Sequence, residues 1–541
     1  RERVHLCASQ PNETMAQPND GSGRAPVAIV RPTTSVTSGV AVTQKLVSAA
    51  VAFGDLMRGT FGPNGLDKMM YKTNGETAVT NDGAKIVAEL LVKHPAAKAF
   101  VQLAESQENA CGDGVTGCLI VASELMREAG RLLERGLHPL VLIEGYLAAQ
   151  SATNEHITNA SESWKGDTGR LVNVAKTAMN GTSADVEDNS MANLVVDALQ
   201  LVARDGVADY EDVRMTKRGQ GNLADSRLVD GLLLDANLFL DRLPRHLEAG
   251  TLLALTCPLD QENTTRDAEI EVETADQWMA FIDAKEDLLS HKAKQILATG
   301  ATAVFSAETI EPSIAHILAD EGVFVLGGLE RSGIEDMARA SGASMCDHLD
   351  DLSPEILGHF SSLQIETSES LDGRRERLCL QFGEHAGIAT IDVGGGDGVA
   401  VEEVIRGLFD ALRSVANAME STQLVRGGGC MHMGAALAIK EAAEQQSGRE
   451  RLAMEAYARA LEAVPSTLAA NAGADRLDSL LALRSAHRQG QEICGIGPSG
   501  GVEPIEEAWA PAQTLLHSLD AATETACGLL RVDQVISARG D

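Results

Sequence analysis

Aromatic side chains and lysines are both scarce in this 541-residue sequence. Phe, Trp and Tyr make up only 3% of it, so Ala, Val, Leu and Gly must fill the core; this favours close-packed helices and buried strands over an aromatic-rich sandwich. Only 13 Lys accompany 32 Arg, and the 78 acidic residues give a net charge of −33. Such a surface repels nucleic-acid phosphates and anionic lipid headgroups, so we expect neither as a partner.

Two explanations of this acidity stay open. An acidic, Lys-poor surface suits a protein in a concentrated-salt cytosol, where screening suppresses self-repulsion. Ordinary acidic drift would give the same composition. The charge alone therefore leaves the source organism undecided.

Long apolar runs are also absent. No run of 18 or more uninterrupted apolar residues is present, so we predict no membrane span. Residues 1–26 are mostly polar, lack the apolar segment of a signal peptide and are expected to form a flexible tail, with Met15 as an alternative start. The nine cysteines are scattered and odd in number, which indicates reduced thiols and a cytoplasmic location.

The order of patterns predicts a multidomain α/β chain of about three or four domains. Helical texture at both ends encloses a middle with α/β texture, which indicates a discontinuous domain built from the two ends. We predict helices over 36–60, 95–107, 119–135, 276–298 and 334–340, and one carrying Leu515 to Leu530. Short apolar runs predict strands at 78–80, 232–234, 303–305, 323–326 and 388–391.

Four glycine-containing loops are candidates for chemistry. They lie at residues 60–63, 80–83, 112–116 and 427–429. Glycine lets backbone N–H groups approach phosphate oxygens, and a helix beginning near Thr116 would add its positive end. Neighbouring Asp residues could hold Mg²⁺. Each loop alone is more typical of an ordinary turn.

Two other motifs are weaker. Residues 112–117 match G-x-G-x-x-G, but the residues before them are polar and helical rather than a strand, which argues against a dinucleotide site. Cys430 and His432 lack further ligands at zinc spacing. A buried cysteine beside the loop is the better interpretation.

Taken together, the motifs resemble the group II chaperonins, namely the archaeal thermosome and the eukaryotic cytosolic chaperonin. The resemblance runs from about Val27 to Arg539 and is closer to the archaeal members. The matching segments, in family order, are 62–69 (GPNGLDKM), 80–83 (TNDG), 94–98 (HPAAK), 112–114 (GDG), 257–260 (CPLD), 331–334 (RSGI), 349–358 (LDDLSPEILG), 427–429 (GGG) and 530–536 (LRVDQVI).

The resemblance implies the group II chaperonin fold. A helical equatorial domain would comprise 27–145 and 405–541, and a small hinge-like intermediate domain 146–218 and 370–404. An α/β apical domain would comprise 219–369, with a helical protrusion near 271–298 as a built-in lid. On that protrusion Trp278, Met279, Phe281 and Ile282 would be either exposed or packed beneath it.

The resemblance further implies an ATP-dependent chaperone that hydrolyses ATP with Mg²⁺, and with K⁺ as a further cation. Asp82 and Asp410 would act as catalytic residues on the attacking water, and Asp113 would hold the metal. The implied nucleotide-binding residues are Gly62, Pro63, Asp113, Gly114, Val115, Thr116, Gly117, Asn180, Gly181, Gly428 and Glu503.

The implied partners are unfolded or partly folded proteins and other subunits in two stacked rings, eight to a ring. The clients, the ring symmetry and whether the ring is homomeric or mixed are open.

Several positions depart from the family pattern. Val115 replaces a usual Thr, Thr182 stands where a Lys that senses the γ-phosphate is common, Lys85 replaces a Thr, and Gly327-Gly328 replaces paired Arg. The alternative is therefore a degenerate ring subunit that binds nucleotide and substrate but hydrolyses little. The carboxylates at 82, 113 and 410 favour the active chaperone, because degeneration should remove them first.

Overall fold

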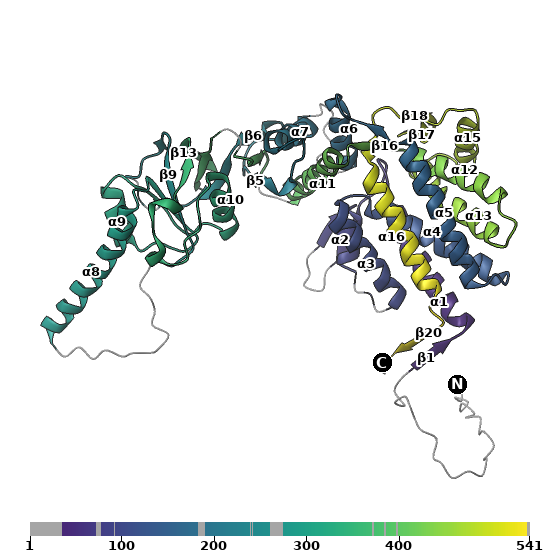
Figure 1. Cartoon of the computed structure of the whole chain (residues 1–541), viewed down its shortest axis with the longest axis horizontal. Coiled ribbons are helices and arrows are strands. Elements are labelled where there is room, and N and C mark those ends of the chain that lie inside the picture. The colour runs from purple at the N-terminus through teal and green to yellow at the C-terminus, as the bar shows by residue number, and fades with distance from the viewer. Residues whose placement is uncertain are drawn as a thin grey trace, which may run out of the picture.

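The computed structural model describes residues 35–71, 77–90, 92, 94–181, 190–238, 240, 242–259, 274–370, 373–383, 386–396 and 399–537. In these residues the chain is elongated, with a helical part at one end, an α/β part at the other and a smaller part between (Figure 1). Each part is organised around its own cluster of buried side chains, which we call the helical core, the sheet core and the middle core.

The helical core unites the two ends of the chain (Figure 1). From the first part of the chain it takes helices α1 (Val40–Arg58), α2 (Gly83–Ala88), α3 (Pro95–Cys111), α4 (Val115–Glu134) and α5 (Pro139–Ala160). From the last part it takes α12 (Cys430–Glu444), α13 (Glu450–Leu461), α14 (Ala463–Asn471) and α16 (Ala512–Leu530). Helix α4 is central, because apolar side chains cover most of its circumference and nearly all are buried.

Local signals set the ends of these helices. Helix α3 begins with Pro95 at its first position, and the His94 ring accepts a hydrogen bond from the Ala96 N–H at 3.3 Å. It ends at Gly112, whose φ of 71° is the left-handed conformation that closes a helix.

Two small sheets lie at the rim of the helical core. Strands β1 (Ser35–Ser38) and β20 (Gln534–Ser537) pair antiparallel, so the two ends of the described chain lie side by side. Strands β2 (Lys68–Tyr71) and β3 (Thr77–Thr80) pair antiparallel and expose the apolar side chains of Met69 and Tyr71.

The sheet core lies at the opposite end, between two four-stranded sheets. The first has the order β11-β10-β9-β12, with β9 (Gly250–Leu255), β10 (Ala303–Ser306) and β11 (Phe324–Leu326) parallel and β12 (Gly358–Phe360) antiparallel. The second is antiparallel and comprises β7 (Leu232–Ala236), β14 (Gly373–Gln381), β13 (Ser362–Ser370) and β8 (His246–Leu247). Helices α8 (Ala275–Ala298), α9 (Pro312–Asp320) and α10 (Arg331–Ser341) complete this part.

The middle core joins the other two. It contains α6 (Thr168–Met179), α7 (Ser190–Val202), α11 (Val399–Ser421) and a sheet of β5 (Val213–Lys217), β15 (Ala389–Val393) and β6 (Arg227–Asp230). Two further β-structures link this region to α15 (Arg476–Arg488) and the helical core. One is a sheet of β19 (Trp509–Pro511), β16 (Gln423–Arg426) and β4 (Glu162–Ser163), and the other is the hairpin of β17 (Cys494–Ile496) and β18 (Val502–Pro504). Helix α11 buries its apolar side chains in the middle core along most of its length.

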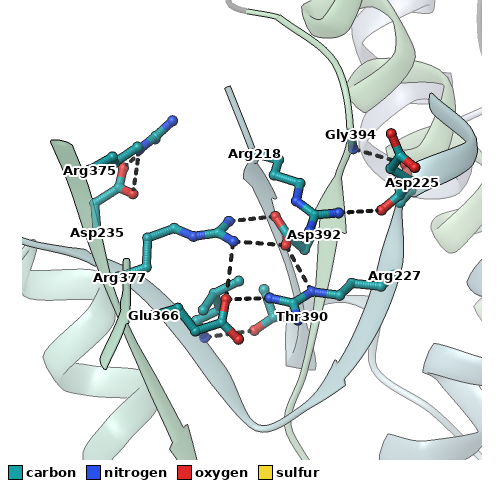
Figure 2. A network of polar contacts seen from close by, with 12 residues as sticks. Arg218, Asp225, Arg227, Asp235, Glu366, Arg375, Arg377, Thr390, Asp392 and Gly394 are labelled. Carbon is teal, nitrogen blue, oxygen red and sulfur yellow. Dashed lines mark hydrogen bonds and ion pairs between the residues drawn. The ribbon is translucent and has the colours of Figure 1, made fainter. Parts of the chain in front are cut away.

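A network of charges connects the middle core to the sheet core (Figure 2). Asp392 on β15 is fully buried and accepts hydrogen bonds from both terminal nitrogens of Arg377 on β14, at 2.6 and 3.1 Å, and from Arg227 Nε at 3.1 Å. Glu366 on β13 contacts the same two arginines at 2.5 and 3.3 Å. We call this network the outer junction; its strands belong to two different sheets.

Most of the predicted elements are confirmed. Helices α3, α4, α8, α10 and α16 cover the predicted helical patterns to within one residue. Strands β3, β7, β10, β11 and β15 cover the predicted strands to within one residue. The start of the 36–60 prediction was wrong, because residues 35–38 form β1 and the helix begins at Val40. The eight cysteines in the described part of the chain are free thiols, as predicted.

Candidate functional site

Four carboxylates from four segments lie near enough to interact electrostatically where α11 meets the helical core. Asp82 lies at the start of α2, Glu108 on the last turn of α3, Asp113 between α3 and α4, and Asp410 in the middle of α11. Each of Asp82, Asp113 and Glu108 acts electrostatically on Asp410. The predicted residues Asp82 and Asp113 are thus brought near Asp410, which lies about 300 residues further along the chain.

The loop at Asp113 is shaped by two left-handed glycines. Gly112 has φ 71° and Gly114 has φ 81°, and the Gly114 N–H donates to Asp113 Oδ1 at 2.5 Å. Among the residues that the structure describes, no side chain caps the start of α4, so its first N–H groups are available for an anion. The buried Gln107 side chain donates to the Asp113 carbonyl at 2.8 Å and fixes the loop from behind.

The loop at Asp82 packs directly against this one. Asp82 caps α2 by accepting from the Ala84 N–H at 2.9 Å, and its own N–H donates to Thr80 Oγ1 at 3.2 Å. A Cβ at Gly83 would lie 2.5 Å from Thr116 Oγ1, which leaves room only for glycine. The predicted residue Thr116 therefore lies at the contact between the two loops.

Two further predicted loops adjoin the first pair. The Asn81 amide donates to the Gly181 carbonyl at 2.7 Å, and a Cβ on Gly181 would lie 3.6 Å from the Gly62 carbonyl and 3.8 Å from that of Pro63. Asn180 and Gly181 end α6 of the middle core. The loop at Gly62 and the end of α6 therefore meet beside Asp82.

Gly117 connects the start of α4 to the same loop. A Cβ at Gly117 would lie 3.4 Å from the ring of Phe61. The loop of residues 60–65 thus packs on the first turn of α4.

The predicted residues Gly428 and Glu503 lie on the far side of that loop. The Gly428 carbonyl accepts from the Ile496 N–H at 2.7 Å, so the glycine loop is attached to the β17–β18 hairpin. Glu503 is exposed on β18 with its carboxylate over Gly497. The Asn64 amide donates to the Pro498 carbonyl at 2.7 Å, which ties the hairpin to the loop at Gly62.

Burial and mutual repulsion raise the pKa values of the clustered carboxyls. The pKa of Asp410 lies well above its ordinary value, mainly because of desolvation and then because of Asp82, Asp113 and Glu108. Desolvation, Asp82 and Asp113 raise the pKa of Glu108 to about 7, with Arg413 acting in the opposite direction. The pKa of Asp113 is raised by desolvation and Asp82 and partly lowered by the Gly114 N–H. The site's own arginines therefore do not compensate four ionised carboxylates, and the carboxyls favour their protonated forms until a cation binds.

This arrangement fits a magnesium ion that arrives with a phosphate. Within the described residues, no three His, Cys, Asp or Glu side chains are grouped so as to hold a metal alone. Mg²⁺ in proteins is ordinarily held by one or two carboxylates together with phosphate oxygens and water. Asp113, beside the start of α4, offers such a ligand, and a cation there would relieve the repulsion among the carboxyls.

The positions that depart from the family pattern differ in their surroundings. The Val115 side chain is buried in the helical core, so only its backbone faces the loop. Lys85 and Asp82 line a cavity of about 280 Å³ between α2 and α3, together with Glu108. Thr182 lies outside the described residues.

The sequence reasoning missed the arginines of α11. Arg406 Nε lies 4.0 Å from Asp82 Oδ2, and Arg406 Nη1 donates to Glu403 at 2.9 Å. Arg413 Nη1 donates to Glu108 Oε1 at 3.3 Å, and the Asn417 amide donates to the Cys111 carbonyl at 3.0 Å. The signal was the helical spacing of residues 406, 410, 413 and 417, which puts four polar side chains on one face of an otherwise apolar helix.

Comparisons with known proteins agree with these features. The model of the TCP-1/cpn60 chaperonin family matches residues 53–540. The chain is 34% identical over 523 residues to thermosome subunit beta of Archaeoglobus fulgidus, which covers 95% of both chains. It is 36% identical over 502 residues to a thermosome subunit of Methanopyrus kandleri, which covers 91% of both, and 34% identical over 517 residues to thermosome subunit 1 of Haloferax volcanii, which covers 95% of this chain and 92% of that one.

Among the described helices, none combines the length and the apolar surface that crossing a membrane requires.

Proposed function

The chain belongs to the TCP-1/cpn60 chaperonin family, and from this premise we propose that the four-carboxylate site binds ATP with Mg²⁺ and hydrolyses it. As a family member it is an ATP-dependent chaperonin subunit that works in a ring complex. The observation that carries the proposal for the site is the convergence of Asp82, Asp113 and Asp410 beside the uncapped start of α4.

In this mechanism each group has one task. The free N–H groups at the start of α4 and the loop at Gly62 bind phosphate oxygens, and the Thr116 hydroxyl adds a donor. Asp113 would hold Mg²⁺, which neutralises phosphate charge when bound. Asp82 and Asp410 orient the attacking water and accept its proton, which requires both carboxyls to be ionised. Burial and the neighbouring carboxyls raise the pKa of Asp410, and its ionised form would be favoured by a cation held at Asp113.

Helix α11 would couple ATP hydrolysis to the conformation of the subunit. Its apolar side chains are buried in the middle core, while Asp410 projects into the site. A movement of the middle core relative to the helical core would therefore bring or withdraw a catalytic carboxylate. Hydrolysis and the position of the outer parts of the subunit would then depend on each other.

The predicted domains take their places in this scheme as proposals. The helical core would be the equatorial domain, the middle core the intermediate domain and the sheet core the apical domain. The packing of α11 favours an intermediate domain that extends beyond residue 404.

Helix α8 would carry the lid and contact unfolded clients. Trp278, Met279 and Phe281 are exposed, with 55%, 56% and 40% of their surfaces accessible, and Ile282 is partly buried. Of the two alternatives that the sequence left open, exposure therefore describes three of these side chains, and packing beneath the protrusion describes only Ile282 in part.

Ring neighbours would bind near the two small sheets of the helical core. The β2–β3 pair exposes Met69 and Tyr71 at 75% and 80%. In the part of the chain that the structure describes, the β1–β20 pair is a sheet of two strands, whose outer edges could pair with another chain. Two stacked rings of eight subunits, K⁺ as a further cation and a cytoplasmic location stay predictions.

The decisive experiment is steady-state ATP turnover by the purified assembly in high-potassium buffer. We expect Asp410→Asn to lower kcat by about 100-fold or more, since a positioned acid–base group contributes at least that much, while a fluorescent ATP analogue still binds. Glu420→Gln, an exposed carboxylate on the same helix, is the matched control and should leave turnover unchanged.

Two results would change this conclusion. Equal turnover in wild type and Asp410→Asn would remove Asp410 from the mechanism. An intact ring that binds nucleotide without turnover would favour the degenerate subunit, and Val115→Thr with Thr182→Lys should then restore hydrolysis.

A further inference from the structure

The side chain of Arg413 joins α11 to the last turns of α3, directly before the loop that carries Asp113. Its Nη1 donates to Glu108 Oε1 at 3.3 Å and its Nη2 donates to the Asn109 carbonyl at 3.0 Å. Both acceptors belong to the last turns of α3, directly before the loop. Only 11% of the Arg413 side chain is exposed, so these bonds form in a largely desolvated contact.

The chain is shaped around this side chain. A Cβ at Gly112 would lie 2.6 Å from both Cδ and Nε of Arg413, so only glycine lets the arginine cross the end of α3. On its other side the guanidinium stacks over the Tyr210 ring, 5.2 Å from its centroid, and the Phe409 ring lies at 5.9 Å. These two rings pack edge to face at 5.6 Å and fix the position of the guanidinium.

Helical geometry transmits this position to the catalytic carboxyl. Asp410 and Arg413 are three residues apart on α11 and therefore share a face. Asn417, four residues further along, donates to the Cys111 carbonyl at 3.0 Å and extends the same contact. Whatever holds Arg413 against the end of α3 also sets the distance between Asp410 and the loop.

We propose that Arg413 is a positioning residue for ATP hydrolysis: it clamps α11 onto the end of α3 and so holds Asp410 beside the phosphate-binding loop. This inference rests on the proposed function of the site. Arginine suits the task better than lysine, because its planar fork serves two acceptors while its face stacks on an aromatic ring. A displacement of about 1 Å at a reacting group can cost about 100-fold in rate.

The test separates positioning from binding. Arg413→Met removes the fork but keeps an apolar stem of similar length, and we expect kcat to fall about 10- to 100-fold with KM and the Kd of the ATP analogue unchanged. Arg413→Lys keeps the charge and one contact and should recover part of the loss. Arg331→Met, which removes an exposed arginine paired with Glu335 on α10, is the control and should match wild type.

A second measurement distinguishes failure of this inference from failure of the proposed function. Hydrogen exchange of the amides at residues 108–113 and along α11 needs no turnover, and Arg413→Met should accelerate it while Arg331→Met does not. If wild type hydrolyses ATP and Arg413→Met has the same kcat or the same exchange, the clamp is wrong and the function stands. A drop in turnover accompanied by lost nucleotide binding or ring assembly would also overturn the positioning role. If wild type is inactive, the proposed function fails, and the exchange data alone decide whether the clamp exists.

Discussion

The middle core is attached to its two neighbours by contacts of different character. At the outer junction the ion pair between Arg377 and Asp392 (Figure 2) is almost fully buried, with 4% and 0% of the two side chains exposed. At the contact between α11 and α3, which we call the inner junction, Arg413 is 11% exposed but its partner Glu108 is 32% exposed. Beside it, Arg406 Nε lies 4.0 Å from Asp82 Oδ2.

This difference separates a fixed connection from one that can open. Removing one member of a buried ion pair leaves an uncompensated charge and costs several kcal/mol, whereas partly solvated pairs exchange with water at little cost. We therefore expect the sheet core and middle core to stay together while the inner junction opens and closes. The carboxylate site lies at the junction that can change.

The largest effect should come from breaking the outer junction. Arg377→Met leaves Asp392 buried with Arg227 as its remaining arginine, and we expect a loss of about 3 kcal/mol in the free energy of opening of β14 and β15. Hydrogen exchange of these strands measures it.

Arg375→Met is the control on the same strand. Its contact with Asp235, which is 58% exposed, should be worth about 1 kcal/mol or less. Adding Asp392→Leu to Arg377→Met should recover much of the stability. Equal costs for the two arginine variants would contradict the contrast between the junctions.

An intermediate effect is expected at the inner junction from Gly112→Ala. The added Cβ meets the Arg413 side chain and is also strained at φ 71°, whereas Gly136→Ala carries the same strain at φ 84° with nothing within 4 Å. The strain alone costs about 1 kcal/mol. Thermal unfolding should show a larger loss for Gly112→Ala, and equal losses would mean that Arg413 moves aside freely.

The smallest effect is a change in the pH dependence of stability. The pKa of Glu108 is about 7 in the folded chain against an ordinary 4.5, so the folded state binds the proton more tightly. Stability contributed by this group is complete below about pH 4.5 and is lost as the pH rises through about 7. Glu108→Gln removes this dependence, so its urea midpoint relative to wild type should rise between about pH 5 and about pH 8. If the urea midpoints of Glu108→Gln and wild type change in parallel between about pH 5 and about pH 8, Glu108 does not titrate in that pH range.

The sequence predicted helices and strands better than it predicted contacts between distant segments. The apolar spacing of α4 and α16 and the turn glycines were sufficient for their positions. Val36 was assigned to a helix because its partner, Ile536 on β20, lies at the other end of the chain. The local pattern of apolar residues cannot reveal a strand whose partner lies 500 residues away in the sequence.

The same limit applies to charged residues. The glycine loops and the family resemblance pointed to Asp82 and Asp113, whose roles stay predictions. Arg377 and Asp392 were missed, because charged residues are normally exposed and the neighbouring sequence contains no signal that these two are buried. Arg413 was missed for a similar reason, since its acceptors are some 300 residues away.

The division of the helical core has a consequence for biosynthesis. Its first half ends near Ile157 on α5 and its second half begins near Val425, with residues 158–424 between them. At about 5–20 residues per second, a ribosome needs roughly 15 to 50 seconds to make that stretch. For this period α1, α3, α4 and α5 expose the apolar faces that α12, α13 and α16 later cover. A nascent subunit is therefore open to aggregation until its last helix has emerged, and this chaperone family member itself needs protection while it is being translated.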